Sequence, residues 1–300
     1  MSALRTFVVV AMALACSCAA QPAKPAPVRP LAELPESHRA LWEAWLARDP
    51  DWPSKRARAL ADPALTEFLV QNLLRVLMGT YDQAGFTTLA RERLGSFERA
   101  RAELIVLDAA SVPYLVELMG IADSAMGDLC ASILEEIGRP AVVPVTALLG
   151  RGNQARMRAA DLLGRLPSAG EAEPEVFAAL ARSLAEDPFW IVRSEAAQSL
   201  GQRGTRAAAT APTRAALSAA LAADADSGVR EAAARALVQL EDPAAIPALI
   251  EYLERAMRDS DLRSLQIAQA SLRRLSGVQQ TLDPAGWRAW WRSNGGLGPP

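Results

Sequence analysis

The chain has 300 residues, 51% of them hydrophobic and 5% aromatic, and its 32 basic and 34 acidic residues give a formal net charge of −2. No long run of one charge sign occurs, so the sequence gives no electrostatic reason to expect nucleic acid or an anionic membrane surface as a partner. Long segments rich in Ala, Leu, Arg and Glu favour helices, and alternating β-branched stretches bounded by Asn-Gly or Asp-Gly turns are missing, so an all-α fold is predicted.

Residues 1–20 have the order of a secretory signal peptide. Arg5 is the only charged side chain among them, an apolar run follows from Phe7 to Ala15, and small residues come next. The apolar run is about half of the roughly 20 residues that a membrane-spanning helix needs. We therefore expect an exported protein rather than one anchored by a transmembrane helix.

Two cleavage sites fit this signal. The sequence from Ala13 to Cys16 resembles a bacterial lipobox, although Ala13 stands where leucine is usual, and this resemblance implies a lipid on Cys16 as the mature N-terminus. The alternative is ordinary cleavage after Ala20, which gives a periplasmic or secreted protein. Residues 21–30 contain four prolines and are predicted to be a semi-rigid linker. A linker directly after Cys16 favours a lipid anchor in the bacterial envelope over a free N-terminus.

Residues 31–110 are predicted to form an N-terminal helical region that includes early repeats. An amphipathic helix is expected over 37–51, and further helices over 64–79 and 87–107. Three tryptophans near the beginning are expected to pack against the first helices: Trp42, Trp45 and Trp52.

An internal repeat follows. The segment Val192 to Gly201 has a copy 37 residues earlier that starts at Ala155, and another 37 residues later that starts at Val229 (192 − 155 = 229 − 192 = 37). A weaker copy starts at Met126, and a degenerate one lies around Ala268. Relative positions 0, 4, 5 and 8 of each copy fall on one face of a helix, and positions 4 and 5 are mostly alanine. This face is predicted to be buried against a closely packed neighbouring helix.

A second helix is expected to precede each copy. Val112-Pro113, Val143-Pro144 and Ile246-Pro247 open such helices, since proline is tolerated in the first helical turn. N-capping residues are expected in the turns within each pair, namely Asn153, Asp187 and Asp226. Each unit is thus a helical hairpin, which must stack on its neighbours to bury its apolar face.

This pattern resembles the HEAT-repeat family, in particular the short bacterial repeats grouped with phycobilisome lyases. The resemblance is carried by the Val-Arg-x-x-Ala-Ala-x-x-Leu-Gly run at 192–201 and by the Val-Pro openings. It implies a right-handed α-solenoid of stacked antiparallel hairpins over 111–277, with the second helices on the concave side. The family supports many unrelated binding roles.

Residues 278–300 are predicted to form a capping helix and tail. Trp287, Trp290 and Trp291 are spaced i, i+3 and i+4, so their indoles point to one side of a short helix. We expect them to be a structural plug over the open face of the last repeat. The alternative is an exposed aromatic platform for a ligand.

No catalytic or metal-binding pattern is found in the sequence. His38 is the only histidine and has no partner arranged for a metal or a triad, and Cys130 is expected to be a buried small hydrophobic residue. Gly201 to Gly204 follow a helix rather than a strand and indicate a helix end, not a phosphate-binding loop. The predictions are that the protein is not an enzyme and needs no cofactor and no metal.

Candidate partner-binding residues lie on the predicted concave face. Position 0 of three consecutive copies is followed by an arginine, and these form a row: Arg156, Arg193 and Arg230. Trp190 could anchor a partner. The alternative is structural: each arginine bonds a turn carboxylate or carbonyl of a neighbouring repeat, and Trp190 packs between repeats.

These observations predict a non-catalytic scaffold of the bacterial envelope that binds a protein partner. Two alternatives stay open: an enzyme or enzyme accessory, since related repeat proteins act as bilin lyases, and a purely architectural envelope protein.

Overall fold

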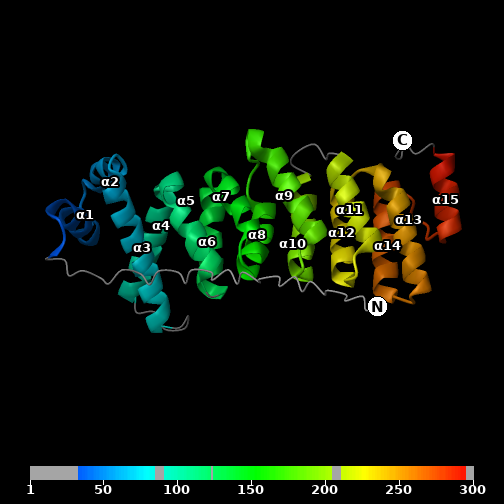
Figure 1. Cartoon of the computed structure of the whole chain (residues 1–300), viewed down its shortest axis with the longest axis horizontal. Helices are drawn as coiled ribbons and strands as arrows, with labels where there is room; N and C mark the ends of the chain where they lie inside the picture. The colour runs from blue at the N-terminus through cyan, green and yellow to red at the C-terminus, as the bar shows by residue number, and fades with distance from the viewer. Residues whose placement is uncertain (1–32, 85–90, 123, 205–210, 295–300) are drawn as a thin grey trace, which may run out of the picture.

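The computed structural model describes residues 33–84, 91–122, 124–204 and 211–294. Within these ranges the chain forms fifteen α-helices with short 3-10 turns and no β-strand. The helices lie side by side in one long row that runs from the N-terminal to the C-terminal end (Figure 1). The predicted all-α solenoid of helical hairpins is confirmed. None of the described helices combines the length and hydropathy needed to cross a bilayer.

Four helices form the N-terminal part of the row: α1 (Glu36–Ala47), α2 (Trp52–Leu60), α3 (Pro63–Ala84) and α4 (Arg91–Val106). The helix predicted over 37–51 ends earlier than expected. Arg48 takes up a left-handed conformation with φ 56°, and its N–H bonds the Ala44 and Trp45 carbonyls, which closes α1. Trp52 therefore belongs to a separate helix.

Five hairpins follow: α5 (Val112–Ile121) with α6 (Ser124–Ile137), α7 (Val142–Ala147) with α8 (Asn153–Arg165), α9 (Glu173–Glu186) with α10 (Trp190–Gly204), α11 (Ala211–Ala223) with α12 (Ser227–Gln239), and α13 (Ile246–Arg258) with α14 (Leu262–Ser276). The last helix is α15 (Pro284–Ser293). As predicted, Val112 opens α5 and Ile246 opens α13, each followed by proline in the first turn.

The turns inside the hairpins are held partly as expected. Asp226 caps α12 by accepting hydrogen bonds from the Gly228 and Val229 N–H groups. The capping prediction for Asn153 is wrong, because α8 already begins at that residue and Gly152 precedes it. Asp187 accepts from the N–H of Phe189, just before α10 begins, and so holds the turn.

The recurring helix faces form the core. All six alanines at positions 4 and 5 of the three central copies are fully buried: Ala159, Ala160, Ala196, Ala197, Ala233 and Ala234. The flanking residues at positions 0 and 8 are buried as well, and all of these side chains except Ala155 belong to one cluster that runs through the stack. The repeat pattern therefore produces a continuous core between hairpins, as expected for a solenoid.

Small residues let the second helices approach closely. A Cβ atom at Gly201 in α10 would lie 2.7 Å from the Cα of Ala236 in α12, where no side chain can move aside. On the other side of α10, the Ser199 hydroxyl donates a hydrogen bond to the Ala160 carbonyl of α8. The glycine is thus required by the spacing of α10 and α12.

We expect Gly201→Ala to lower the free energy of unfolding by about 1–3 kcal/mol, because the added methyl group overpacks the contact with α12. Gly95→Ala in α4 is the matched control, since a Cβ there meets nothing within 4 Å. Replacing a glycine inside a helix with alanine should stabilise by roughly 0.5–1 kcal/mol at such an open position. Urea denaturation followed by circular dichroism compares the two, and equal effects would show that the helix spacing does not require Gly201.

Candidate partner-binding surface

Two arginines of the predicted row connect successive hairpins. The Nε of Arg156 lies 2.6 Å from Asp187 Oδ2, and the Nε of Arg193 lies 2.7 Å from Asp224 Oδ2. In both pairs the aspartate is 31 residues downstream, in the turn of the next hairpin. These ion pairs are mostly buried, so they fix the turns relative to each other.

The charges of the Arg193–Asp224 pair stabilise each other. Hydrogen bonding to Asp224 raises the pKa of Arg193. Burial alone would raise the pKa of Asp224, but its hydrogen bonds to Arg193 and to the Asp226 N–H outweigh burial and lower it. Both groups are therefore ionised at neutral pH.

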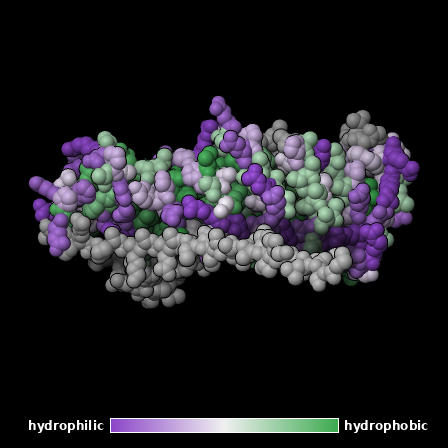
Figure 2. All heavy atoms as spheres, in the orientation of Figure 1, coloured by the Kyte–Doolittle hydropathy of each residue, from purple (hydrophilic) through white to green (hydrophobic). Residues whose placement is uncertain are grey.

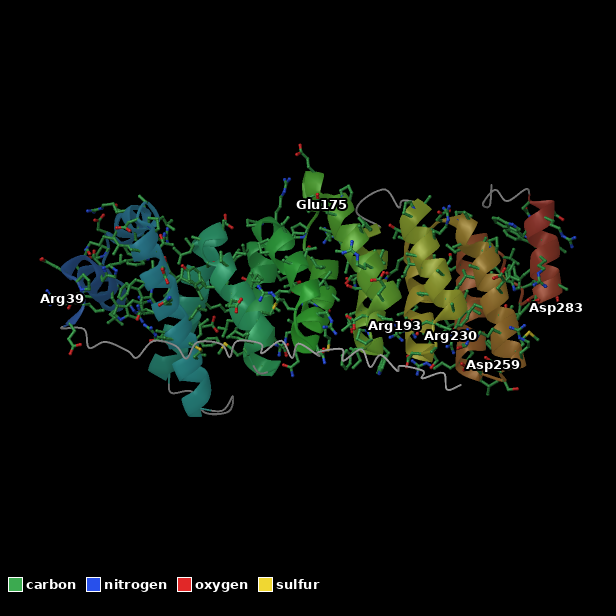
Figure 3. All side chains as sticks on the ribbon, viewed as in Figure 1. Arg39, Glu175, Arg193, Arg230, Asp259 and Asp283 are labelled. Carbon is green, nitrogen blue, oxygen red and sulfur yellow. The ribbon has the colours of Figure 1, made fainter. Side chains whose placement is uncertain are left out.

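The third arginine of the row is bonded differently. Arg230 Nη1 donates to the carbonyls of Asp224 and Ala225, 2.8 and 3.0 Å away, in the turn of its own hairpin. Asp261, in the next turn, accepts from the Ser264 hydroxyl at 2.6 Å. Figure 3 shows Arg193 and Arg230 at similar heights on neighbouring helices. Within the stack, the guanidinium groups of these three arginines bond carboxylates and carbonyls of the turns. Their contact with a partner stays a prediction.

An exposed apolar cluster lies at the turn between α9 and α10. Phe189, Trp190 and Ile191, called the rim cluster below, are 45%, 49% and 40% exposed. The guanidinium carbon of Arg156 lies 5.7 Å from the centre of the Phe189 ring. A Cβ at Gly228 would lie 3.4 Å from the Trp190 ring, so this indole rests on the start of α12 while half of it meets solvent.

Further apolar side chains are exposed at other turns of the same type. Ile121 ends α5, and Met257 and Leu262 flank the turn between α13 and α14, with Leu262 74% exposed. Because the hairpins are stacked, the turns that join the two helices of each hairpin lie along one edge of the row. Figure 3 shows Asp259 toward the same lower edge as Arg193. On the face seen in Figure 2, apolar and polar side chains are interleaved rather than gathered in one band.

Sequence reasoning selected Trp190 but missed its neighbours. Phe189 ends the connection between α9 and α10, and Trp190 and Ile191 open α10, a place where solvated polar residues are usual. Three consecutive large apolar residues at such a helix start are the signal that could have identified the cluster.

The C-terminal tryptophans pack against the last hairpin. Trp287 is fully buried, and its Nε1–H donates to Gln269 Oε1 at 3.2 Å. The Gln269 amide donates in turn to the Leu282 carbonyl. Gln269 lies at position 5 of the degenerate copy, where the central copies have alanine. It faces α15, whereas those alanines face the second helix of a neighbouring hairpin. Trp290 meets Trp287 edge-on, and Trp290 and Trp291 are partly buried against the core.

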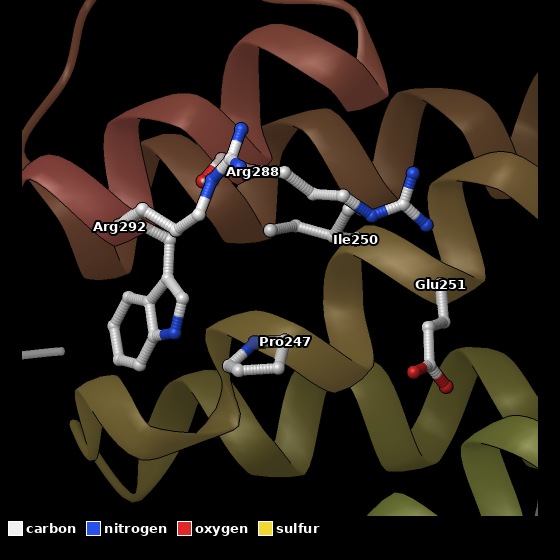
Figure 4. Close-up of a pocket in the computed structure, with 6 residues that line it drawn as sticks. Pro247, Ile250, Glu251, Arg288 and Arg292 are labelled. Atoms are coloured by element: carbon white, nitrogen blue, oxygen red, sulfur yellow. Dashed lines mark hydrogen bonds between the residues drawn. The ribbon is translucent and has the colours of Figure 1, made fainter.

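A groove of about 320 Å³ lies at the junction of α13 and α15. It is lined by Pro247, Ile250, Glu251, Arg288, Trp291 and Arg292 (Figure 4). Arg288 is engaged with Glu254 of α13, which ties α15 to the last hairpin. Trp291 is thus the member of the tryptophan set that borders an open groove, whereas Trp287 is inaccessible to a ligand.

The remaining sequence candidates are not brought together. His38 lies in α1 with its ring 4.8 Å from that of Phe68. Cys130 is buried, and burial raises the pKa of its thiol to about 12. Among the described residues no three His, Cys, Asp or Glu side chains group as a metal site. Cys16 lies outside the described residues.

One buried ion pair was missed by sequence reasoning. Arg203, in the last turn of α10, has a side chain that is 1% exposed and pairs with Glu173 through two bonds of 2.7 and 2.6 Å. It also donates to the carbonyls of Leu163, Leu166 and Pro167. Gly201 to Gly204, expected to follow the helix, belong to the described part of α10. An arginine in such a turn is usually solvated, and nothing in the sequence pairs it with a residue 30 positions away.

Comparison with known proteins gives one family. Residues 178–270 match the family model of HEAT repeats, a segment that runs from α9 to α14. A search of curated proteins gave no match. HEAT repeats are commonly protein-interaction scaffolds. The stacked hairpins α9 to α14 have the arrangement that a match to HEAT repeats implies for this segment.

Proposed function

We propose that this protein is a non-catalytic interaction scaffold of the bacterial envelope that binds a protein partner at the rim cluster. The proposal depends on one observation above all. Phe189, Trp190 and Ile191 are large apolar residues, consecutive in the chain, and each is at least 40% exposed within the segment that matches HEAT repeats.

The rim cluster has the properties of an interaction hot spot. Burying apolar surface is favourable by about 25 cal/mol per Å², and tryptophan is enriched among residues that dominate binding. The turn that carries the cluster is held by Asp187, which bonds both Arg156 and the Phe189 N–H. Because the turn held by Asp187 is fixed before binding, little conformational entropy is lost when a partner docks.

The arginine row is the second part of the proposed surface. Arg156 and Arg193 stand on either side of the rim cluster in the chain and keep their positive charge while bonded to aspartates. Their donors are engaged and their charges are balanced by Asp187 and Asp224, so they hold the turns on which the rim cluster stands. An apolar segment that docks on the rim cluster is the partner chemistry that fits.

We expect Trp190→Ala to weaken partner binding by at least about 30-fold, the effect of removing a hot spot worth about 2 kcal/mol. The partner is first trapped by a photo-crosslinking residue at position 190, identified, purified and then titrated against each variant by calorimetry. Leu262→Ala is the matched control, because Leu262 is also exposed at a hairpin turn but lies two units away. Equal affinities of Trp190→Ala and the unaltered protein would contradict the proposal.

The proposed envelope anchor is a lipid on Cys16. Cys16→Ser is expected to move the protein from the membrane fraction to the soluble fraction, since a lipid chain supplies about 0.8 kcal/mol of membrane affinity per buried CH₂ group. Cys18→Ser, two residues further on, is the matched control and should stay with the membrane. Fractionation followed by immunoblotting measures this, and an unchanged distribution of Cys16→Ser would refute the anchor while leaving the scaffold proposal intact.

A further inference from the structure

A pocket lies at the N-terminal end of the row, between the α1–α2 connection and α4. Its volume is about 350 Å³, within the range of small-molecule sites. The residues that carry the argument are Trp45, Arg48, Asp49, Trp52, Arg99 and Glu103. The predicted packing role of the tryptophans near this end is fulfilled by Trp45, which is buried and stacked on Trp42.

Both carboxylates of the pocket already have partners. Asp49 Oδ2 lies 2.5 Å from Lys55 Nζ, and its other oxygen accepts the Asp51 N–H. Glu103 accepts from Arg56 at 3.2 Å. Neither carboxylate forms an ion pair with the two arginines of the wall.

The two arginines of the pocket differ in their bonding. Arg99 donates to the Trp45 carbonyl at 2.5 Å, and its guanidinium lies 4.4 Å above the Trp45 ring. The Arg48 side chain forms no hydrogen bond or ion pair with a described residue. Burial lowers the pKa of Arg99, and the charge of Arg48 lowers it further, while Glu103 raises it. The lining thus holds two guanidinium groups and two carboxylates, and each carboxylate is paired with a cation outside the lining, Lys55 or Arg56.

An unsatisfied donor lies in the same wall. The Nε1–H of Trp52 is buried and has no hydrogen-bond partner in the described part of the chain. Buried polar groups are nearly always paired in native proteins. The donors that the pocket offers to a ligand are therefore those of the guanidinium groups, whereas the buried Trp52 N–H marks an indole in the wall whose surroundings a bound ligand would change.

We propose that this pocket binds a small organic carboxylate, with the carboxylate between Arg48 and Arg99 and the apolar part against Trp52. A carboxylate presents two acceptor oxygens in one plane, which matches the fork of a guanidinium group. The carboxylate belongs either to a free small molecule or to the C-terminus of a short peptide, because both carry the same chemistry. The site is separate from the rim cluster, so it is independent of the proposed scaffold function.

The indole region of an ¹H–¹⁵N NMR spectrum tests the proposal, because the seven tryptophans give few signals and Trp52→Phe identifies that of Trp52. Titration with benzoate should shift the Trp52 signal, and benzamide, the uncharged analogue, should bind at least about tenfold more weakly, since a charge-assisted bond is lost. A capped dipeptide with a free C-terminal phenylalanine forms the second arm, and the tighter ligand indicates the source of the carboxylate.

Two variants make the test specific. Arg48→Gln changes an exposed side chain and should weaken binding of the better probe about tenfold or more. Arg58→Gln is the control, because Arg58 is exposed on α2 and does not line this pocket. The proposal is overturned if neither probe shifts the Trp52 signal at concentrations up to about 10 mM, which corresponds to negligible affinity. It is also overturned if Arg48→Gln binds as tightly as Arg58→Gln.

Discussion

Glu173→Ala is expected to lower the free energy of unfolding by about 3–5 kcal/mol, because it leaves the charge of Arg203 buried without its partner. Arg203 is 1% exposed in its side chain and donates both of its bonds to a carboxylate to Glu173. The backbone carbonyls around Arg203 supply acceptors but no negative charge. Urea denaturation followed by circular dichroism measures the loss.

Glu175→Ala is the matched control for this variant. Glu175 lies two residues further along α9, is exposed, and points away from the stack in Figure 3. Its replacement should change stability by less than about 0.5 kcal/mol, as is usual for surface positions. The double variant Glu173→Leu with Arg203→Met removes both charges and should recover part of the loss. Equal effects of the two single variants would contradict a structural role for the pair.

The same pair predicts a pH dependence. Burial would raise the pKa of Glu173, but hydrogen bonds from Arg203, the Ala169 N–H and Ser168 lower it below its ordinary value of 4.5. A carboxyl group with a lowered pKa stabilises the fold above its unfolded pKa, and this contribution is lost as the pH falls through the folded pKa. The stability difference between the unaltered protein and Glu173→Ala should therefore be constant above about pH 5 and shrink at lower pH.

Trp287→Ala is expected to cost about 3–5 kcal/mol of unfolding free energy, the range for removing a fully buried large aromatic side chain. The variant opens a cavity under α15 and leaves the Gln269 side-chain oxygen without its indole donor. Because each unit of a solenoid contacts only its neighbours, the loss should begin at the C-terminal end. Hydrogen–deuterium exchange should increase first in α13 to α15 and last in the central hairpins.

Trp291→Ala provides the comparison on the same helix. Trp291 borders the groove between α13 and α15 and is only partly buried, so its removal should cost clearly less than that of Trp287. If Trp291→Ala were the more destabilising variant, or if exchange in Trp287→Ala rose uniformly along the chain, α15 would not be a terminal cap.

The repeat faces were predictable because their chemistry is local. A close helix contact is indicated wherever alanine recurs at positions 4 and 5 between apolar residues at positions 0 and 8. The structure shows the alanines at position 5 of the central copies fully buried: Ala160, Ala197 and Ala234. The prolines that open α5 and α13 act in the first turn alone, so their place could also be predicted.

Features that depend on residues far apart in the chain were not predictable. The end of α1 requires Arg48 in a left-handed conformation, which a sequence without glycine there does not indicate. The Arg203–Glu173 pair joins residues 30 positions apart, and the N-terminal pocket combines α4 with the α1–α2 connection. Composition shows the charges of these residues but not that they meet.

A charge-reversing variant is a poor test of partner contact at the arginine row. Arg193→Glu would replace an ion pair with repulsion against Asp224 and leave a turn carboxylate unpaired. It therefore disturbs the stack and any partner contact at once. Trp190→Ala removes a half-exposed side chain and leaves both arginine–aspartate pairs in place, so it disturbs the stack less than Arg193→Glu does.

Hydrogen–deuterium exchange of the protein with and without its purified partner tests the scaffold claim most directly. Docking at the rim cluster predicts slower exchange in residues 187–193 and in the first turn of α12, with little change in α15. Protection confined to other parts of the row, with residues 187–193 exchanging as in the free protein, would contradict it.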